Sequence, residues 1–143
     1  QVYETAAMGA DAMLLVVRIL DDEQLASLLA LARGVGLETL VEIHDETDAQ
    51  RIANLDVPVV GINNRDLAHF QTDVERAARI AALLPRGAAV VAASGIHGEP
   101  DIRKSLAAGI RRFLVGETLV KAPDPAALLR QWTSIAVPNL LNS

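Results

Sequence analysis

The chain has 143 residues, of which 51% are hydrophobic, 22% are charged and only 3% are aromatic. These values predict one compact domain with an aliphatic core, and the net charge of -5 argues against nucleic acid or an anionic membrane as a partner. The sequence contains no cysteine, which excludes a thiolate nucleophile, a disulfide and a zinc–cysteine site, and no apolar run is as long as a membrane span. We expect a cytoplasmic location.

In chain order, the pattern begins with a helix on which Val2, Ala6 and Met8 share a face and which Gly9 ends. After it, apolar β-branched runs alternate with amphipathic stretches at helical spacing. The runs predict strands at about 11–17, 38–43, 58–63, 88–93 and 111–115. The stretches predict helices at about 22–34, 46–55, 72–84, 99–108 and 124–133. Asp21 or Asp22 is expected to cap the helix at 22–34.

The strict alternation of strands and helices indicates a parallel sheet. By length alone, five strands fit a doubly wound sheet, whereas a closed (β/α)8 barrel needs eight strands. The motifs described below favour the barrel. On that interpretation residues 1–134 form one partial (β/α) barrel domain and residues 135–143 a C-terminal extension.

Polar residues and glycines stand at the carboxyl ends of four predicted strands. They are Glu42, His44, Asn63, Ser94, Gly95, Gly116 and Glu117. A (β/α) barrel carries its chemistry at these ends of otherwise inert strands, so function is sought there.

The ordered set of strand-end segments resembles the C-terminal part of indole-3-glycerol phosphate synthase, the decarboxylating, ring-closing enzyme of tryptophan biosynthesis. The similarity runs from residue 1 to residue 132 and begins in the helix after the family's third strand. It implies a TIM (β/α)8 barrel, of which this chain supplies about five βα units. The segments are Gly9-Ala10-Asp11-Ala12-Met13, Leu40-Val41-Glu42-Ile43-His44-Asp45, Gly61-Ile62-Asn63-Asn64-Arg65-Asp66-Leu67, Ala93-Ser94-Gly95-Ile96 and Phe113-Leu114-Val115-Gly116-Glu117-Thr118-Leu119.

The resemblance implies a small phosphorylated substrate, 1-(2-carboxyphenylamino)-1-deoxyribulose 5-phosphate. Ring closure, loss of carbon dioxide and dehydration give indole-3-glycerol phosphate, with no metal and no organic cofactor. This chemistry needs an acid that activates the ketone and a group that moves protons during dehydration. It also needs an apolar slot for the anthranilate ring and a phosphate clamp.

Two residues match catalytic positions of the family. Glu42 matches a carboxylate that transfers protons during dehydration, and Asn63 matches an asparagine that orients that carboxylate or a substrate hydroxyl. From the residues alone, Glu42 is either a partly buried acid at a strand end or an outward-facing glutamate. Asn63 read alone is an ordinary turn asparagine.

The predicted phosphate clamp consists of Ser94, Gly95, Gly116 and Glu117, at the ends of the last two strands. Barrels of this class hold phosphate there on backbone N–H groups, and glycine lets the backbone approach the anion closely. Glu117 then offers its N–H while its carboxylate points away. The alternative is that the glycines serve only as turns.

The predicted slot for the substrate ring comprises Leu14, Leu67, Phe70 and Leu114, which match slot positions of the family. Each can equally belong to the core, and for Leu14 and Leu114 the residues alone favour the core. The histidines do not suggest a metal site. His44 shares a strand face with Glu42 and either reaches the pocket or satisfies a loop, while His69 and His97 are expected in exposed loops.

The chain departs from the family pattern at Ala93, where the family has a glutamate immediately before Ser-Gly-Ile. That glutamate helps to bind the substrate, and a methyl group cannot accept a hydrogen bond. The family's catalytic lysines and a further glutamate lie on its first three strands, which these 143 residues do not include.

Three interpretations are compatible with these observations. The first is a five-strand portion of the synthase barrel, completed by the missing barrel half or by self-association. The second is a non-catalytic half-barrel that still binds phosphate, either a pseudoenzyme or an interaction module. The third is another phosphate-handling barrel, such as phosphoribosylanthranilate isomerase, against which the block at 61–67 argues.

Overall fold

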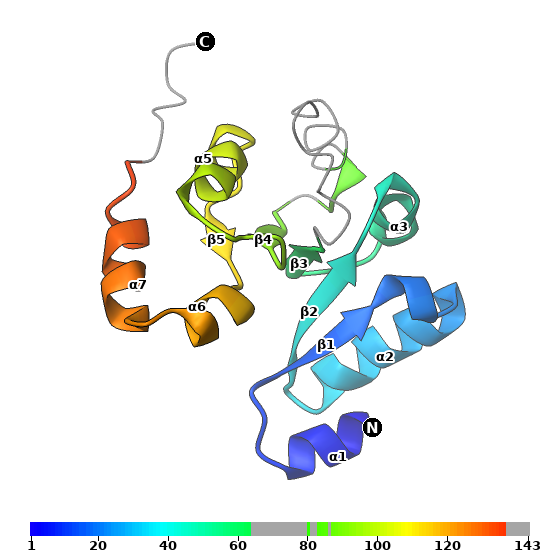
Figure 1. Ribbon diagram of the computed structural model, residues 1–143. Helices are drawn as coiled ribbons and strands as arrows, with labels where there is room; N and C mark the ends of the chain where they lie inside the picture. The colour runs from blue at the N-terminus through cyan, green and yellow to red at the C-terminus, as the bar shows by residue number, and fades with distance from the viewer. Residues whose placement is uncertain (64–79, 81–82, 86, 137–143) are drawn as a thin grey trace.

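The computed structural model describes residues 1–63, 80, 83–85 and 87–136. Its centre is a five-stranded sheet that crosses the middle of Figure 1, with neighbouring strands parallel in the order β1-β2-β3-β4-β5. The strands are β1 (Ala12–Val16), β2 (Glu38–Ile43), β3 (Val59–Ile62), β4 (Ala89–Ala92) and β5 (Arg112–Phe113). A doubly wound sheet reverses its strand order at a switch point, whereas a barrel adds strands in sequence. The doubly wound alternative is therefore wrong, and the partial barrel is confirmed.

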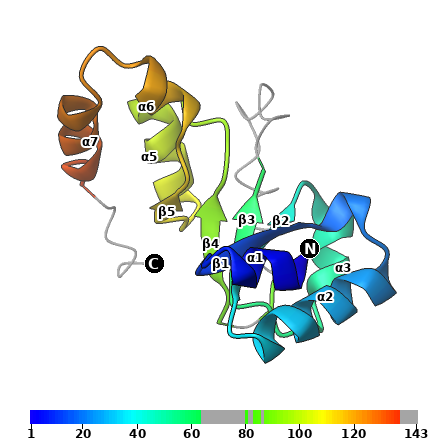
Figure 2. The same ribbon diagram turned by 90° about the horizontal axis from the view of Figure 1, so that it is seen from below.

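Helices follow the strands and surround the sheet from α1 to α7 (Figures 1 and 2). They are α1 (Val2–Ala7), the 3-10 turn η1 (Val17–Ile19), α2 (Asp22–Gly34), α3 (Glu46–Ile52), α5 (Glu99–Ala107), α6 (Glu117–Lys121) and α7 (Pro125–Thr133). The predicted helix at 72–84 lies almost entirely outside the described residues, as do residues 137–143 of the predicted extension. The sequence pattern predicted neither η1 nor α6.

The first helix differs from its prediction at one residue. Val2 is buried as expected, but the side chain of Met8 is 79% exposed. The helix ends at Ala7, so Met8 is its C-cap and leaves the face that Val2 occupies. Gly9 follows with φ +77°, a conformation that favours glycine and ends the helix as predicted.

Alternation along β2 separates the two faces of the sheet. Val41 and Ile43 are fully buried in the main core, where they join Leu25 of α2 and Ile52 of α3. Successive side chains of a strand point to opposite faces, so Glu42 lies on the face turned away from these helices. That face is the inner face of the partial barrel.

At Gly61 of β3 the inner face carries no side chain. A Cβ built on Gly61 would lie 3.2 Å from Leu40 Cδ1 and 3.3 Å from Ala93 Cβ. Leu40, Gly61 and Ala93 therefore share the inner face on three neighbouring strands. Leu14 pairs with Leu40 in register and is 51% exposed, so this face is open to solvent.

Candidate active site

Three polar side chains form a hydrogen-bonded row across the carboxyl ends of β2, β3 and β4. Asn63 Nδ2 donates to Glu42 Oε1 at 2.9 Å, and Ser94 Oγ donates to Asn63 Oδ1 at 2.6 Å. The register of the strands brings these side chains together, since Glu42 lies beside Gly61 and Ile62 lies beside Ala92. The row joins two predicted catalytic residues to one predicted clamp residue.

The placement of Glu42 excludes the alternative that its sequence left open. The side chain of Glu42 is only 16% exposed and lies on the inner face, so it is not an outward-facing glutamate. Asn63 donates its backbone N–H to Ile43 O at 2.8 Å, which continues the ladder between β2 and β3. The residues that follow Asn63 lie outside the described ranges, so the turn alternative stays open. The catalytic roles of both residues stay predictions.

The loop after β2 brings further charge to this edge of the sheet. Asp45 caps α3, and the N–H of Asp48 donates to its carboxylate at 3.0 Å. That hydrogen bond lowers the pKa of Asp45, and the Arg18 guanidinium, 2.9 Å away, acts in the same direction. His44 belongs to the site as well, since its Nε2 lies 3.6 Å from Glu42 Oε1.

The predicted phosphate clamp lies at the ends of β4 and β5. Gly95 has φ +74°, and Gly116 is the N-cap of α6. A hydrogen bond from Thr118 Oγ1 to Ile96 O, 2.7 Å long, ties the two segments together. Ser94 donates its hydroxyl hydrogen to Asn63, so backbone amides are the donors that this arrangement offers to an anion. Phosphate binding itself stays a prediction.

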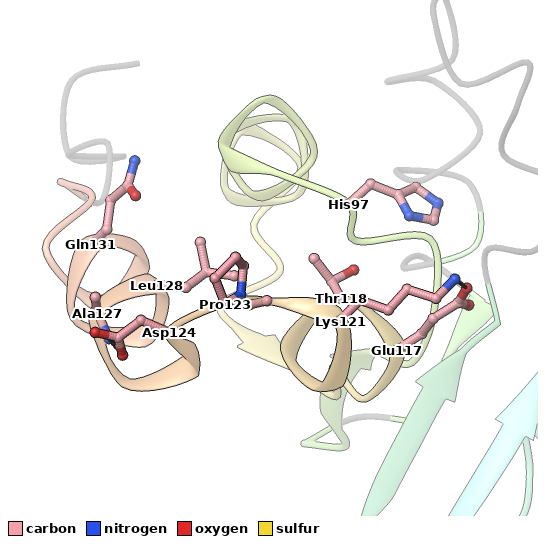
Figure 3. A pocket seen from close by; sticks show the side chains of 10 residues that line it. His97, Glu117, Thr118, Lys121, Pro123, Asp124, Ala127, Leu128 and Gln131 are labelled. Carbon is pink, nitrogen blue, oxygen red and sulfur yellow. Dashed lines mark hydrogen bonds and ion pairs between the residues drawn. The ribbon is translucent and has the colours of Figure 1, made fainter.

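Glu117 turns its carboxylate toward Lys121, one helical turn further along α6, with Oε1 2.6 Å from Nζ. The pair stands at one end of a hollow of about 580 Å³, with His97 above it and α7 at the other end (Figure 3). The side chains of Glu117, Thr118, Lys121 and Asp124 make local contacts, including the cap in which Asp124 accepts from Ala127 N at 2.8 Å. These contacts stabilise helix ends.

The predicted ring slot is described only in part. In this chain Leu14 and Leu114 are 51% and 55% exposed and lie outside the clusters of buried residues, and their role in a completed barrel stays a prediction. Leu67 and Phe70 lie outside the described residues, and so does His69. Ala93 presents its methyl group to the inner face beside Gly61, which leaves the row without the glutamate of the family pattern.

Sequence reasoning gave little weight to three residues at this site. His44 and Asp48 accompany Glu42, and Thr118 joins the two halves of the predicted clamp. The spacing of Glu42 and His44 signals a shared strand face, but no pattern identifies the partners of Asp48 or Thr118. Within the described ranges, no group of three or more His, Asp or Glu residues is arranged to hold a metal ion.

Comparison with known families decides the identity of the fold. A sequence model described as indole-3-glycerol phosphate synthase matches residues 1–132. The chain belongs to the indole-3-glycerol phosphate synthase family. The resemblance that the strand-end segments predicted is thereby confirmed.

Three curated indole-3-glycerol phosphate synthases are 42% to 50% identical in sequence to this chain. The protein of Desulfosudis oleivorans is 50% identical over 131 residues, which are 92% of this chain and 50% of the relative. Those of Albidiferax ferrireducens and Opitutus terrae are each 42% identical over 92% of this chain and 50% of their own lengths. The chain spans about half the length of the curated relatives it matches.

A solved structure supports the barrel fold. A mandelate oxidase mutant with a monooxide FMN adduct superposes with a TM-score of 0.65 and 18% identity, over 92% of this chain and 49% of that one. At this identity the similarity concerns the fold alone. Among the helices that the structure describes, none has the length and apolar character needed to cross a lipid bilayer.

Proposed function

We propose that this chain provides the C-terminal five βα units of an indole-3-glycerol phosphate synthase that acts in tryptophan biosynthesis in the cytoplasm. In the proposed reaction the anthranilate ring carbon that bears the carboxylate bonds to the ketone carbon of the sugar phosphate. The carboxylate leaves as carbon dioxide, and the former ketone oxygen then leaves as water. To balance its protons, the reaction requires one group that protonates this oxygen and another that accepts a ring or chain proton. It requires no oxidant.

The row of Glu42, Asn63 and Ser94 is the observation that carries this proposal. A largely buried carboxylate at a barrel strand end is suited to proton transfer during dehydration. The Asn63 amide holds Oε1 of that carboxylate at 2.9 Å and limits its rotation. In this scheme Glu42 moves the proton, and Asn63 orients Glu42 or a substrate hydroxyl.

The phosphate and the ring of the substrate would lie next to this row. Backbone amides at Ser94, Gly95, Gly116 and Glu117 form the proposed clamp, which the Thr118 bridge to Ile96 supports. The exposed Leu14 and Leu114 supply apolar surface for the ring. The acid that activates the ketone belongs to the family's first three βα units, outside these 143 residues.

Ala93 favours a second candidate function. Its methyl group stands where the family places a carboxylate that binds the substrate, so a non-catalytic half-barrel that retains phosphate binding is consistent with the same geometry. The two candidates differ in what restoring the carboxylate should do.

Ring closure tests the first candidate. We expect no turnover by the 143 residues alone and at most weak turnover when the three missing βα units are supplied as a separate fragment. Ala93→Glu in the assembled barrel should raise the rate about tenfold or more, which corresponds to about 1.4 kcal/mol of transition-state stabilisation. Formation of indole-3-glycerol phosphate is followed by its fluorescence. A rate that stays at background in the Ala93→Glu barrel favours the non-catalytic candidate.

Two substitutions on β2 separate proton transfer from general effects of charge. Glu42→Gln should lower the rate by about 100- to 10,000-fold, the range typical of a lost general acid or base. Glu38→Gln is the matched control, because Glu38 occupies the same face at the other end of the same strand and is exposed. Equal effects of the two substitutions would contradict the role of Glu42.

Inorganic phosphate tests the clamp without turnover. Titration should move the backbone amide resonances of Gly95, Gly116 and Glu117 first, and Glu42→Gln should leave these shifts intact. Larger shifts elsewhere, with none at these amides, would remove the clamp from the proposal.

The partner proposal follows from the open sheet. Unpaired edges at β1 and β5 and the exposed inner-face leucines are unfavourable in water, so we expect the chain to associate with itself or with the missing barrel half. Sedimentation across a wide concentration range should show association, which the complementary fragment reduces. A compact monomer at all concentrations would contradict this expectation.

A further inference from the structure

His44 stands between two carboxylates just beyond β2. Its Nε2 lies 3.6 Å from Glu42 Oε1, and its Nδ1 lies 3.6 Å from Asp48 Oδ2. The imidazole is 20% exposed and Asp48 only 7% exposed, so both contacts are largely shielded from water. A histidine ring carries two nitrogens on a rigid frame, and its protonated form donates from both of them at once.

The position of the ring is fixed from the Asp48 side. The carboxylate of Asp48 accepts the backbone N–H of His44 at 2.9 Å, through the oxygen that also faces Nδ1. Asp48 is in turn fixed in the first turn of α3, where its own N–H donates to the Asp45 cap. A helix start therefore holds both the backbone and the ring of His44 at the end of β2.

On the other side, His44 and Asn63 converge on one atom. Asn63 Nδ2 donates to Glu42 Oε1 at 2.9 Å, and His44 Nε2 approaches the same oxygen. A shift of about half an ångström brings Nε2 within ordinary hydrogen-bond length of Oε1. We propose that His44 is a positioning residue that fixes Oε1 of Glu42 together with Asn63 and so directs Oε2 toward a bound substrate.

Three substitutions distinguish the two nitrogens. Glutamine places its amide near the position of Nε2 and keeps a donor for Glu42. Asparagine places its amide near the position of Nδ1 and keeps a donor for Asp48 only. Leucine removes both donors and keeps bulk. His44→Asn is therefore the matched control for folding, because it preserves the contact with α3.

The side-chain amide of Asn63 reports the orientation of Glu42 directly, since it donates to that carboxylate. In ¹H–¹⁵N spectra of the chain, we expect His44→Gln to keep the Asn63 amide resonance near its original position. His44→Asn and His44→Leu should shift or broaden it, while the backbone amides of Val41 and Ile43 stay in place. An Asn63 amide that is unchanged in His44→Asn, or that moves equally in His44→Gln and His44→Asn, overturns the proposal.

A second readout rests on the proposed function. In the assembled barrel that carries Ala93→Glu, His44→Asn should lower kcat about tenfold with KM unchanged, because a misdirected carboxylate affects proton transfer and not binding. His44→Gln should restore most of kcat. Equal losses in the two variants overturn the positioning role. Absence of any turnover before substitution counts against the proposed function alone, and the Asn63 amide then decides on His44.

Discussion

The two ends of the sheet differ in how many buried residues pack against them. Among the described residues, the part from β1 to β3, with α2, α3 and Ile80, contains a main core of twelve buried residues, whereas the cluster at β4, β5 and the helices α5 to α7 has five. Strand length follows the same trend, from six residues in β2 to two in β5. Both β1 and β5 are edge strands, so position at an edge does not explain the contrast.

The helix preceding the first strand explains it better. Val2 of α1 packs with Ala32 and Leu37 and covers the β1 end of the core, whereas Leu114 and Leu129 beside β5 remain exposed. At the β1 end this helix thus adds a further cluster of buried residues, which the described residues at the β5 end lack. The difference teaches that Glu42 and Asn63 belong to the stable part, while Gly116 and Glu117 belong to the part that lacks a neighbour.

The largest expected effect of a single substitution lies in the main core. Leu25→Ala should lower the free energy of unfolding by about 2–5 kcal/mol, because Leu25 is fully buried and its removal leaves a cavity. Leu106→Ala in the smaller cluster should cost about 2 kcal/mol or less, since that site can relax. Denaturant unfolding followed by circular dichroism measures both values. Equal costs would show that the two regions are packed equally well.

Arg51 should come next in size. Its guanidinium donates to Val17 O at 2.8 Å and to Leu20 O at 2.6 Å, and its Nε lies 2.6 Å from Asp22 Oδ1. Arg51→Met keeps the stem but leaves the carbonyls of η1 without this donor, at a cost of about 1–3 kcal/mol in unfolding free energy. Arg103→Met in α5 is the control, because it removes only an exposed pair with Glu99. Similar costs for both would contradict a special role for Arg51.

The caps of α3 and α7 give a smaller and pH-dependent contrast. Asp45→Ala should cost about 1 kcal/mol near neutral pH, the usual value for a lost N-cap. Because folding lowers the pKa of Asp45, its ionised form contributes stability above the ordinary pKa, and this contribution disappears as pH falls through the lowered value. Asp45→Asn should keep the cap and lose the pH dependence. Unfolding curves at several acidic pH values test the sign, with Asp124→Ala in α7 as the comparison.

The smallest effects are expected for exposed ion pairs in either region. Lys121→Ala removes a contact with Glu117, and Arg33→Ala removes one with Asp56. Each should change the unfolding free energy by about 0.5 kcal/mol or less, because water and salt screen exposed pairs. Thermal melts at low and high salt check this. A larger loss for Lys121→Ala would show that α6 depends on that contact.

The regular elements were predictable because each carries a local signal. The helix at 22–34 matches α2, and Asp21 forms the expected cap, with Gln24 N donating to its carboxylate at 2.8 Å and Gln24 Oε1 accepting from its N–H. The predicted strand at 38–43 matches β2, and the other four strands are present with one or two residues fewer at each end. Helix α6 carried no such signal, since it has five residues and none of them is buried.

The site was predictable only as far as strand ends determine it. Family resemblance and strand alternation placed Glu42 and Asn63 together. The contact of His44 with Asp48 depends on the turn between β2 and α3, whose geometry no periodicity encodes. The hydrogen bond of Thr118 likewise joins α6 to Ile96, a residue 22 positions earlier in the chain. Such contacts arise from tertiary structure, so local sequence patterns do not predict them.

Gly61 leaves a space that it shares with Ala93, just beyond the neighbouring strand. The space that its side chain would fill is bounded by Leu40 and Ala93, so positions 61 and 93 draw on one shared volume. A side chain at position 61 would press against the Ala93 methyl group, so side chains at the two positions compete for this volume.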